Sequence, residues 1–346
     1  MKAIVFGITG QDGSYLADLL ISKGYEVIGV SRRCSTDNTQ RIKHLLDADN
    51  FKLIEGDITD ASNIYNILSW NDHVDEIYNL AAQSHVGTSF SQPALTWDIT
   101  GKGCLTILQA IVDLGLYNTR FYQASSSEMF GSSYDTNACG EKYQDEDTKF
   151  MPNSPYAIAK CAAHHFVRLF RNAHNLHASS GILFNHESPR RGDNFVTQKI
   201  INWIANYVRW TKHVKHNGEI KFDEDNIIIN GQIFPKLRLG NLEAFRDWGY
   251  AGEYVEAMWL MLQQDYPDDY VICTGKTHTV AEFLDIAFNY VGLTEWRQLI
   301  VIDPQFYRPS EVDFLKGDCT KAQEKLGWKA EYSLEDLVKM MIDAKL

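Results

Sequence analysis

The stretch Lys2-Ala3-Ile4-Val5-Phe6-Gly7-Ile8-Thr9-Gly10-Gln11-Asp12-Gly13 decides the fold of this chain. Its first five residues predict a short β-strand, and the helical spacing of Tyr15, Leu16, Leu19 and Leu20 follows the glycine turn. Glycines let backbone N–H groups approach a pyrophosphate, which the positive end of the following helix also attracts. The spacing is G-x-x-G-x-x-G rather than G-x-G-x-x-G, so the strand-turn-helix context carries the prediction of a dinucleotide site.

The second predicted strand, Glu26 to Val30, ends in Ser31-Arg32-Arg33. An NAD site usually places an acidic residue here for the ribose hydroxyls, whereas two arginines favour a 2′-phosphate. We therefore expect NADP as the cofactor. The alternative is an ordinary basic loop.

Further short apolar runs at 51–57, 76–80, 120–123 and 180–184 alternate with helical stretches. This alternation predicts an α/β fold, a Rossmann-like doubly wound parallel sheet with a smaller, mixed α/β substrate-binding domain. We expect the NADP-binding domain to comprise residues 1–185 with a return segment near 240–262. Residues 186–239 and 263–346 are then the substrate-binding domain. Asp57 and the run from Leu80 to Ser84 follow predicted strands at their carboxyl ends, where such sheets bind ligands.

Ser125-Ser126-Ser127-Glu128 and Tyr156-Ala-Ile-Ala-Lys160 bring a hydroxyl, a carboxylate, a phenol and an ammonium to the same part of the chain. On a helix, residues four apart share a face, so Tyr156 and Lys160 would lie one turn apart. A cation about 4 Å from a phenolate contributes about 4 kcal/mol, which would lower the pKa of Tyr156 toward neutrality. The alternative for an isolated Y-x-x-x-K pattern is a solvated helix face.

The composition narrows the possible partners. The chain has 346 residues, a formal net charge of -12 and 45% hydrophobic residues, typical of a globular enzyme. The negative charge argues against nucleic acid or an anionic membrane as a general partner. The six cysteines lack C-x-x-C spacing, and no signal-peptide pattern or long apolar span is present, so we expect a cytoplasmic protein with reduced thiols.

The second half of the chain is less regular. Asn230-Gly231 lies between apolar residues and predicts a hairpin within the segment 218–235. His213 and His216 have no third ligand nearby in sequence, and we apply the same caution to His164-His165 and His186-Glu187. We therefore expect no metal site.

Several longer motifs carry a resemblance to a known family. They are the glycine stretch Gly7–Leu16, Asn79–Val86, Gln123–Glu128, Ser154–Lys160, Leu183–Gly192, Leu239–Leu242, Arg246–Gly249 and Arg308–Asp313. Together they resemble the extended short-chain dehydrogenases/reductases and, within them, the GDP-mannose 4,6-dehydratases. The resemblance spans nearly the whole chain.

The resemblance implies that Ser126, Glu128, Tyr156 and Lys160 are catalytic. It implies that NADP is bound by Gly7, Thr9, Gly10, Gln11, Asp12, Gly13, Arg32, Asp57, Ile58, Leu80, Ala81, Ala82, Gln83, Ser84, His186 and Arg191, with Lys160 holding the nicotinamide ribose. It implies that GDP-mannose is bound by Asn185, Lys199, Arg246, Arg308 and Glu311. A homodimer or homotetramer is expected, with the loop from Arg33 to Arg41 at a subunit contact.

Some features depart from the family, and two rivals remain open. Ser126 stands where the family usually has threonine, Cys34 where it tends to have serine, and the segments 131–145 and 218–235 look longer than usual. A nucleotide-sugar epimerase or reductase would need Tyr156 and Lys160 but no acid/base at the position of Glu128. A non-enzymatic NADP-binding protein would need no motif around Arg308.

Overall fold

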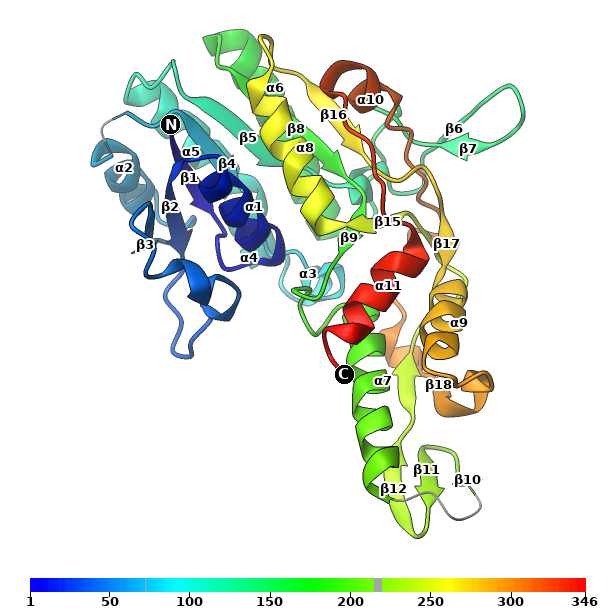
Figure 1. Cartoon of the computed structure of the whole chain (residues 1–346). Coiled ribbons are helices and arrows are strands. Elements are labelled where there is room, and N and C mark those ends of the chain that lie inside the picture. The colour runs from blue at the N-terminus through cyan, green and yellow to red at the C-terminus, as the bar shows by residue number, and fades with distance from the viewer. Residues whose placement is uncertain (72, 215–219) are drawn as a thin grey trace.

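The computed structural model describes residues 1–71, 73–214 and 220–346, and its centre is a seven-stranded parallel sheet (Figure 1). The strand order is β16-β8-β5-β4-β1-β2-β3, so the chain winds outward in both directions from β1 and β4. The strands are β1 (Lys2–Phe6), β2 (Glu26–Ser31), β3 (Phe51–Glu55), β4 (Glu76–Asn79), β5 (Arg120–Ala124), β8 (Ala178–Leu183) and β16 (Asp269–Ile272). This confirms the predicted doubly wound α/β fold.

Helices cover both faces of this sheet. In β1, Ala3 and Val5 enter one apolar core while Ile4 and Phe6 enter the other, as the two-residue period of a strand requires. The first core is completed by α1 (Gln11–Ser22), α8 (Ala251–Gln263) and α10 (Thr320–Leu326). The second is completed by α2 (Ala61–Ser69), α5 (Gly103–Asp113) and α6 (Pro155–His174).

A separate apolar core lies beside the carboxyl edge of the sheet, in the lower right of Figure 1. Its helices are α7 (Val196–Val214), α9 (Val280–Tyr290) and α11 (Leu334–Asp343). Its strand pairs are β9 (Asn185–Glu187) with β15 (Trp248–Tyr250), β13 (Leu237–Leu239) with β18 (Ile300–Ile302), and β14 (Phe245–Arg246) with β17 (His278–Thr279). This smaller α/β unit supplies one wall of the site.

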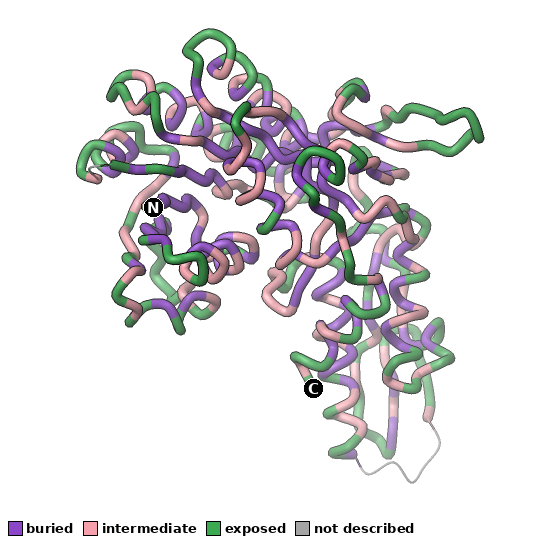
Figure 2. The backbone as a smooth tube through the Cα atoms, turned by 45° about the horizontal axis from the view of Figure 1, so that its top comes forward, coloured by how far each residue is buried: buried purple, intermediate pink, exposed green. Residues whose placement is uncertain are grey.

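A two-stranded hairpin and a three-stranded antiparallel sheet extend from the body of the molecule. β6 (Asp135–Thr136) and β7 (Lys142–Tyr143) form an arm that projects from the sheet, and their residues lie mainly in the exposed class (Figure 2). β10 (Ile220–Phe222), β11 (Asn226–Ile229) and β12 (Gln232–Pro235) extend the unit around α7. The turn between β11 and β12 has positive φ at Asn230 (52°) and Gly231 (76°), which confirms the predicted hairpin.

Short helical segments fill the connections. They are η1 (Gln40–Leu45), α3 (Val86–Ser91), α4 (Pro93–Thr96), η2 (Trp97–Lys102), η3 (Ser127–Phe130), η4 (Trp296–Leu299) and η5 (Pro304–Phe306). In the described part of the chain, no helix combines the length and apolar character needed to cross a membrane.

One boundary differs from the sequence prediction. Residues 263–346 were assigned wholly to the substrate-binding domain, but β16 pairs with β8 at the edge of the central sheet. All four residues of β16 are buried, and they belong to the central sheet because they pair with β8. A run of four residues is too short to show a periodicity from which this pairing could be predicted. The chain therefore returns to the first unit beyond residue 262.

Candidate active site

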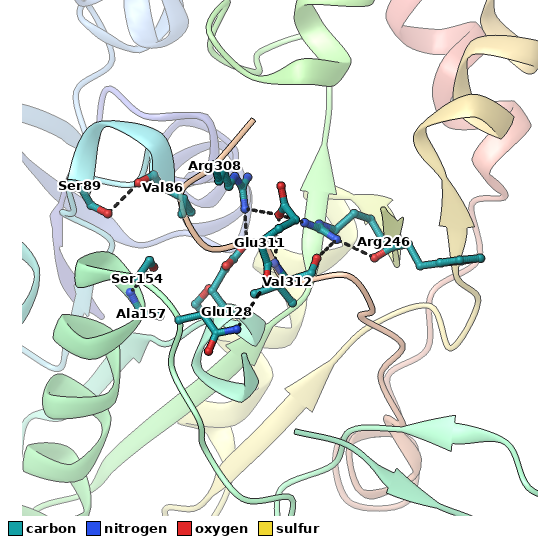
Figure 3. Close-up of polar contacts among 12 residues, drawn as sticks. Val86, Ser89, Glu128, Ser154, Ala157, Arg246, Arg308, Glu311 and Val312 are labelled. Atoms are coloured by element: carbon teal, nitrogen blue, oxygen red, sulfur yellow. Dashed lines mark hydrogen bonds and ion pairs between the residues drawn. The ribbon is translucent and has the colours of Figure 1, made fainter. Parts of the chain in front are cut away.

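Helix α6 presents two of the predicted catalytic side chains. Ser154 begins the helix because its side chain accepts a hydrogen bond from the Ala157 N–H at 3.1 Å, and Pro155 occupies the first helical turn (Figure 3). Tyr156 and Lys160 follow on one helix face and are only 7% and 3% exposed. They are buried, so the solvated-face alternative is wrong.

The end of β5 presents the other two. Ser126 has extended backbone, and its hydroxyl accepts a hydrogen bond from the Glu128 N–H at 3.3 Å, so it caps the short turn η3. Glu128 lies in that turn and is 8% exposed. The cap therefore fixes the Ser126 hydroxyl relative to the backbone of Glu128.

Burial, rather than Lys160, controls the phenol. It raises the pKa of Tyr156 to about 12, while hydrogen bonding with Ser126 opposes this shift and the charge of Glu128 adds to it. Burial also lowers the pKa of Lys160 to about 8. The ammonium lies 5.7 Å from the Tyr156 ring centre and donates to the Ala124 carbonyl at 2.5 Å. The prediction that Lys160 by itself brings the phenol toward neutrality is therefore wrong for the protein alone.

A chain of charges joins Glu128 to the second unit (Figure 3). Nη1 of Arg308 lies 3.2 Å from Glu128 Oε1 and 3.3 Å from Glu311 Oε1. The same Glu311 oxygen accepts from Arg246 Nη2 at 2.9 Å. Arg246 is 7% exposed and also donates to the Val312 carbonyl at 2.6 Å. Three of the predicted substrate-binding residues thus form one cluster with a predicted catalytic residue.

The remaining predicted substrate-binding residues come from β9 and α7. Asn185 pairs with Trp248 in the parallel β9–β15 ladder, and its buried Oδ1 has no hydrogen-bond partner among the residues that the structure describes. Lys199 lies with its ammonium 3.5 Å from the centre of the Phe306 ring. Burial lowers the pKa of Lys199 and the nearby Asp303 opposes that shift. Asn185 therefore retains an acceptor for a ligand.

The first turn of the chain fits a dinucleotide. Gly7 has φ +82°, and a Cβ there would lie 2.9 Å from the Ala81 nitrogen. A Cβ on Gly13 would lie 2.3 Å from the Gly7 carbonyl oxygen, so the turn closes only without side chains. Gly10 N–H donates to the Gly7 carbonyl at 3.0 Å, and α1 begins at Gln11. The amino end of α1 is thereby directed toward the carboxyl edge of the sheet, where an anion is favoured.

Two predicted cofactor residues are paired with each other. His186 Nε2 lies 2.9 Å from Asp12 Oδ2, and its Nδ1 lies 2.7 Å from the Phe184 carbonyl. Burial opposes the charge on Asp12, but the neighbouring His186 lowers the pKa of Asp12 to about 2. Burial lowers the pKa of His186, whereas Asp12 raises it by more, so its net direction is upward. The side-chain amide of Gln11 donates a hydrogen bond to the His186 carbonyl at 3.0 Å.

The other predicted cofactor residues fall into four groups. Arg32 is exposed just after β2, and Ser84 is exposed in the loop after β4. The backbones of Leu80 and Ala81 lie beside Gly7, and Ala82, which follows them, is partly buried. The Asp57 carboxylate accepts a hydrogen bond from the Thr59 hydroxyl, and the Gln83 side-chain amide donates one to the Thr96 hydroxyl. Both side chains thereby stabilise the loops in which they lie. Ile58 is 7% exposed and packs in the core against α5, so its side chain faces the core.

The backbone of the remaining residues lies close to this edge. Thr9 carbonyl accepts from Arg41 Nη1 at 3.3 Å, and Arg191 pairs with Glu187 at 3.0 Å while stacking on Phe195. Arg41 was predicted only as part of a loop, because nothing in its spacing indicates a contact with the glycine turn. His164 is buried and contacts Ser125, a contact that the sequence analysis did not predict, since it weighed His164 only as a possible metal ligand.

Possible metal ligands are scattered. Among residues 1–71, 73–214 and 220–346, no group of three or more His, Cys, Asp or Glu side chains is arranged to hold a metal ion. His213 is exposed at the end of α7, and His216 lies outside the described residues.

Solved structures share this architecture. UDP-glucose 4-epimerase of Thermotoga maritima superposes with a TM-score of 0.79 at 24% identity, covering 99% of this chain and 98% of that one. dTDP-glucose 4,6-dehydratase of Bacillus anthracis gives 0.79 at 19% identity, covering 99% and 96%. These similarities show the fold. In this fold the buried serine, tyrosine and lysine lie at the carboxyl edge of the parallel sheet.

Sequence similarity narrows the class further. The family model described as GDP-mannose 4,6 dehydratase matches residues 4–226 and 225–341. GDP-mannose 4,6 dehydratase 1 of Arabidopsis thaliana is 50% identical over 355 residues, covering 99% of this chain and 89% of that protein. The human GDP-mannose 4,6 dehydratase is 45% identical over 365 residues, covering 99% and 90%. The chain belongs to the GDP-mannose 4,6-dehydratase family.

Proposed function

We propose that this protein is a hydro-lyase that converts GDP-mannose to GDP-4-keto-6-deoxymannose, with hydride moving internally from C4 to C6 of the sugar through NADP. The observation that carries the proposal is the buried carboxylate of Glu128 beside Ser126 and Tyr156. An epimerase or a simple reductase has no step that needs such a carboxylate. Family membership supports the same reaction.

The first role belongs to the phenol. Tyr156 takes the proton of the C4 hydroxyl, and the Ser126 hydroxyl orients the same oxygen. When bound, an oxidised nicotinamide supplies the hydride acceptor and a positive charge, which favours the phenolate form of a tyrosine in the same site. Lys160 holds the ribose of the cofactor from the same helix face. This assignment reconciles the high pKa of Tyr156 in the protein alone with its role as a base.

The second role belongs to Glu128. Once C4 is a ketone, the C5–H is acidic, and Glu128 removes that proton. The carboxylic acid so formed protonates the C6 hydroxyl, which leaves as water. Once the hydride is on C6, C5 takes a proton from solvent through Glu128, and Tyr156 releases to solvent the proton that it took from the C4 hydroxyl. Because η3 holds Glu128 next to Ser126, one short segment serves oxidation and elimination.

The charged cluster of the second unit is proposed to bind the nucleotide diphosphate. Arg246 and Arg308 are guanidinium groups suited to bidentate phosphate contacts. Glu311 holds these two side chains in place. Lys199 and the buried Oδ1 of Asn185 offer further polar contacts for the nucleotide sugar.

For the cofactor, we propose NADP, held by the glycine turn, Asp57, the 80–84 segment, His186 and Arg191, with Arg32 on the 2′-phosphate. The glycine turn supports this, since a Cβ at Gly7 would clash with the Ala81 backbone and a Cβ at Gly13 with the Gly7 carbonyl, so only glycines allow the tight turn that brings the amino end of α1 to the edge of the sheet. We also propose that the unit formed mainly by residues 1–185 carries the cofactor while the smaller unit covers the sugar. The assembly is proposed to be a homodimer or homotetramer.

The test is to incubate the purified protein with GDP-mannose and a catalytic amount of NADP and to identify the product by NMR and mass spectrometry. We expect a 4-keto-6-deoxy sugar nucleotide and no lasting absorbance from reduced nicotinamide. Stoichiometric NADPH, or a preference for UDP-sugars, would overturn the proposal in favour of a reductase or epimerase.

A further inference from the structure

Three side chains on one face of α6 contact three consecutive residues at the end of β5. Tyr156 interacts with Ser126, Lys160 Nζ donates to the Ala124 carbonyl at 2.5 Å, and His164 Nδ1 lies 3.1 Å from Ser125 Oγ. The helix positions are four residues apart, so the face repeats once per turn. The first two are assigned above, and His164 has no role in the proposed chemistry.

His164 is buried and held from its far side. It is 2% exposed, and its Nε2 lies 3.7 Å from Asp269 Oδ2 on β16. Arg171, two turns further along α6, pairs with Asp269 at 2.5 Å. Burial lowers the pKa of His164 to about 4, although Asp269 opposes the shift, so the imidazole is neutral at physiological pH.

The position of Asp269 selects the tautomer. A neutral imidazole carries one N–H, and that proton is best placed on Nε2, which faces a carboxylate. Nδ1 then has only a lone pair and accepts from the Ser125 hydroxyl. With this tautomer the hydrogen bond runs from Ser125 to His164, which gives the Ser125 side chain one orientation.

Ser125 is also held through its backbone. Its N–H donates to the Gly181 carbonyl on β8 at 2.9 Å, and its neighbours in sequence are Ala124 and Ser126. Since Ser126 caps the turn that carries Glu128, a movement at Ser125 displaces the hydroxyl and the carboxylate together. The side-chain bond to His164 is a contact of this segment with the helix that carries the phenol.

We propose that His164 is a positioning residue for catalysis: by accepting the Ser125 hydroxyl, it sets the placement of Ser126 and of the turn bearing Glu128 relative to Tyr156. Asp269 fixes the ring so that the acceptor nitrogen faces Ser125. The inference rests on the proposed function, because it concerns groups that act on the sugar.

The test compares variants of the full-length protein with bound NADP. His164→Phe keeps an aromatic ring but removes the acceptor, and Ser125→Ala removes the donor. Each is expected to lower kcat roughly 10- to 100-fold, in keeping with the cost of misplacing reacting groups by about 1 Å. KM for GDP-mannose should stay within about twofold, because neither residue lies in the Arg246–Arg308–Glu311 cluster.

A conservative pair separates positioning from packing. The amide of His164→Asn can place Oδ1 where Nδ1 lies, and should restore most of kcat, whereas His164→Gln extends toward Asp269 and should not. In a double-mutant cycle, His164→Phe should have almost no further effect once Ser125 is alanine. The matched control is His165→Phe. His165 is the next residue in sequence but its side chain is exposed, so this variant should keep full activity.

The outcomes are distinguishable. If the unmodified protein does not turn over GDP-mannose, the proposed function has failed. If it does and His164→Phe retains full kcat, or if Asn and Gln at this position behave alike, the positioning role is overturned. Melting curves and NADP titrations identify a variant that has failed to fold, and Ser125→Ala then tests the same hydrogen bond from the other side. Additive effects of His164→Phe and Ser125→Ala on kcat would also refute it.

Discussion

Arg308 and Glu128 are 180 positions apart in sequence, yet Nη1 of the arginine lies 3.2 Å from Oε1 of the carboxylate. The two residues belong to different units of the fold, one in the loop after η5 and the other in η3 beside β5. This ion pair links the group proposed to remove the C5 proton with a group proposed to bind the diphosphate. Substrate binding and catalysis therefore meet at one guanidinium.

Replacement of Arg308 tests this double contact. Arg308→Gln removes the cation from both Glu128 and Glu311, and KM for GDP-mannose should rise roughly 10- to 100-fold, the equivalent of losing a charged hydrogen bond of about 1.5–3 kcal/mol. Steady-state kinetics measure the effect. Arg297→Gln, at a side chain that is 72% exposed, is the control. An unchanged KM would remove Arg308 from the substrate site.

Arg32 tests the choice of cofactor. Arg32→Ala removes an exposed guanidinium from the end of β2, and NADP affinity should fall by about 1.5–3 kcal/mol because a charged hydrogen bond is lost. NAD affinity should hardly change. Calorimetric titration with each dinucleotide gives the answer, and Lys43→Ala is the control. Equal affinity of the unmodified protein for NAD and NADP would contradict the assignment.

The Arg33 to Arg41 loop tests self-association. Arg41 fastens this loop to the carbonyls of Thr9 and Arg190, so its outer side chains stand beside the glycine turn. Light scattering coupled to gel filtration should show a dimer or tetramer, and Arg33→Glu should shift the distribution toward smaller species. Lys329→Glu should not. A fully active monomer would refute the expectation.

The Asp12–His186 pair predicts how stability depends on pH. The depressed pKa of Asp12, about 2 against 3.8, gives stability above pH 3.8 that is lost as pH falls toward 2. The raised pKa of His186 gives stability below pH 6.5 that is lost as pH rises through its folded value. The pair therefore stabilises most between about pH 4 and 6.5.

His186→Asn should accordingly lower the free energy of unfolding by about 2 kcal/mol near pH 5 and by less above pH 8. Denaturant titration at both values measures the difference. His44→Asn breaks an exposed histidine–aspartate pair and should cost no more than about 1 kcal/mol. A loss for His186→Asn that grows with pH would contradict the account.

The first half of the fold was predictable because its information is local. The strands, glycine turn and helices of residues 1–185 each correspond to a short run with its own periodicity or turn signal. Ser154-Pro155 is a local signal for the start of α6. The four residues of β16 were misplaced, since their membership of the sheet depends on pairing with β8. Sequence periodicity does not encode such a long-range pairing.

The positions of the proposed catalytic residues were more predictable from the sequence than the pKa values of their side chains. The spacing of Tyr156 and Lys160 correctly placed them on one helix face, but it carried no information about burial, which dominates the pKa of both groups. The contacts of Arg308 with Glu128 and of His164 with Ser125 also join distant segments. Neither pairing has a local sequence signal.

The fate of the C5 hydrogen tests the central claim most directly. In deuterated water with GDP-mannose and NADP, the protein should form a product that carries solvent deuterium at C5, while the hydrogen newly delivered to C6 comes from C4 of the sugar; NMR and mass spectrometry read both positions. Glu128→Gln should bind NADP normally yet lose turnover by at least roughly 100-fold, the usual range for general-base catalysis. A product without deuterium at C5, or a Glu128→Gln variant with near-normal turnover, would contradict the assignment of Glu128 and with it the proposed dehydration.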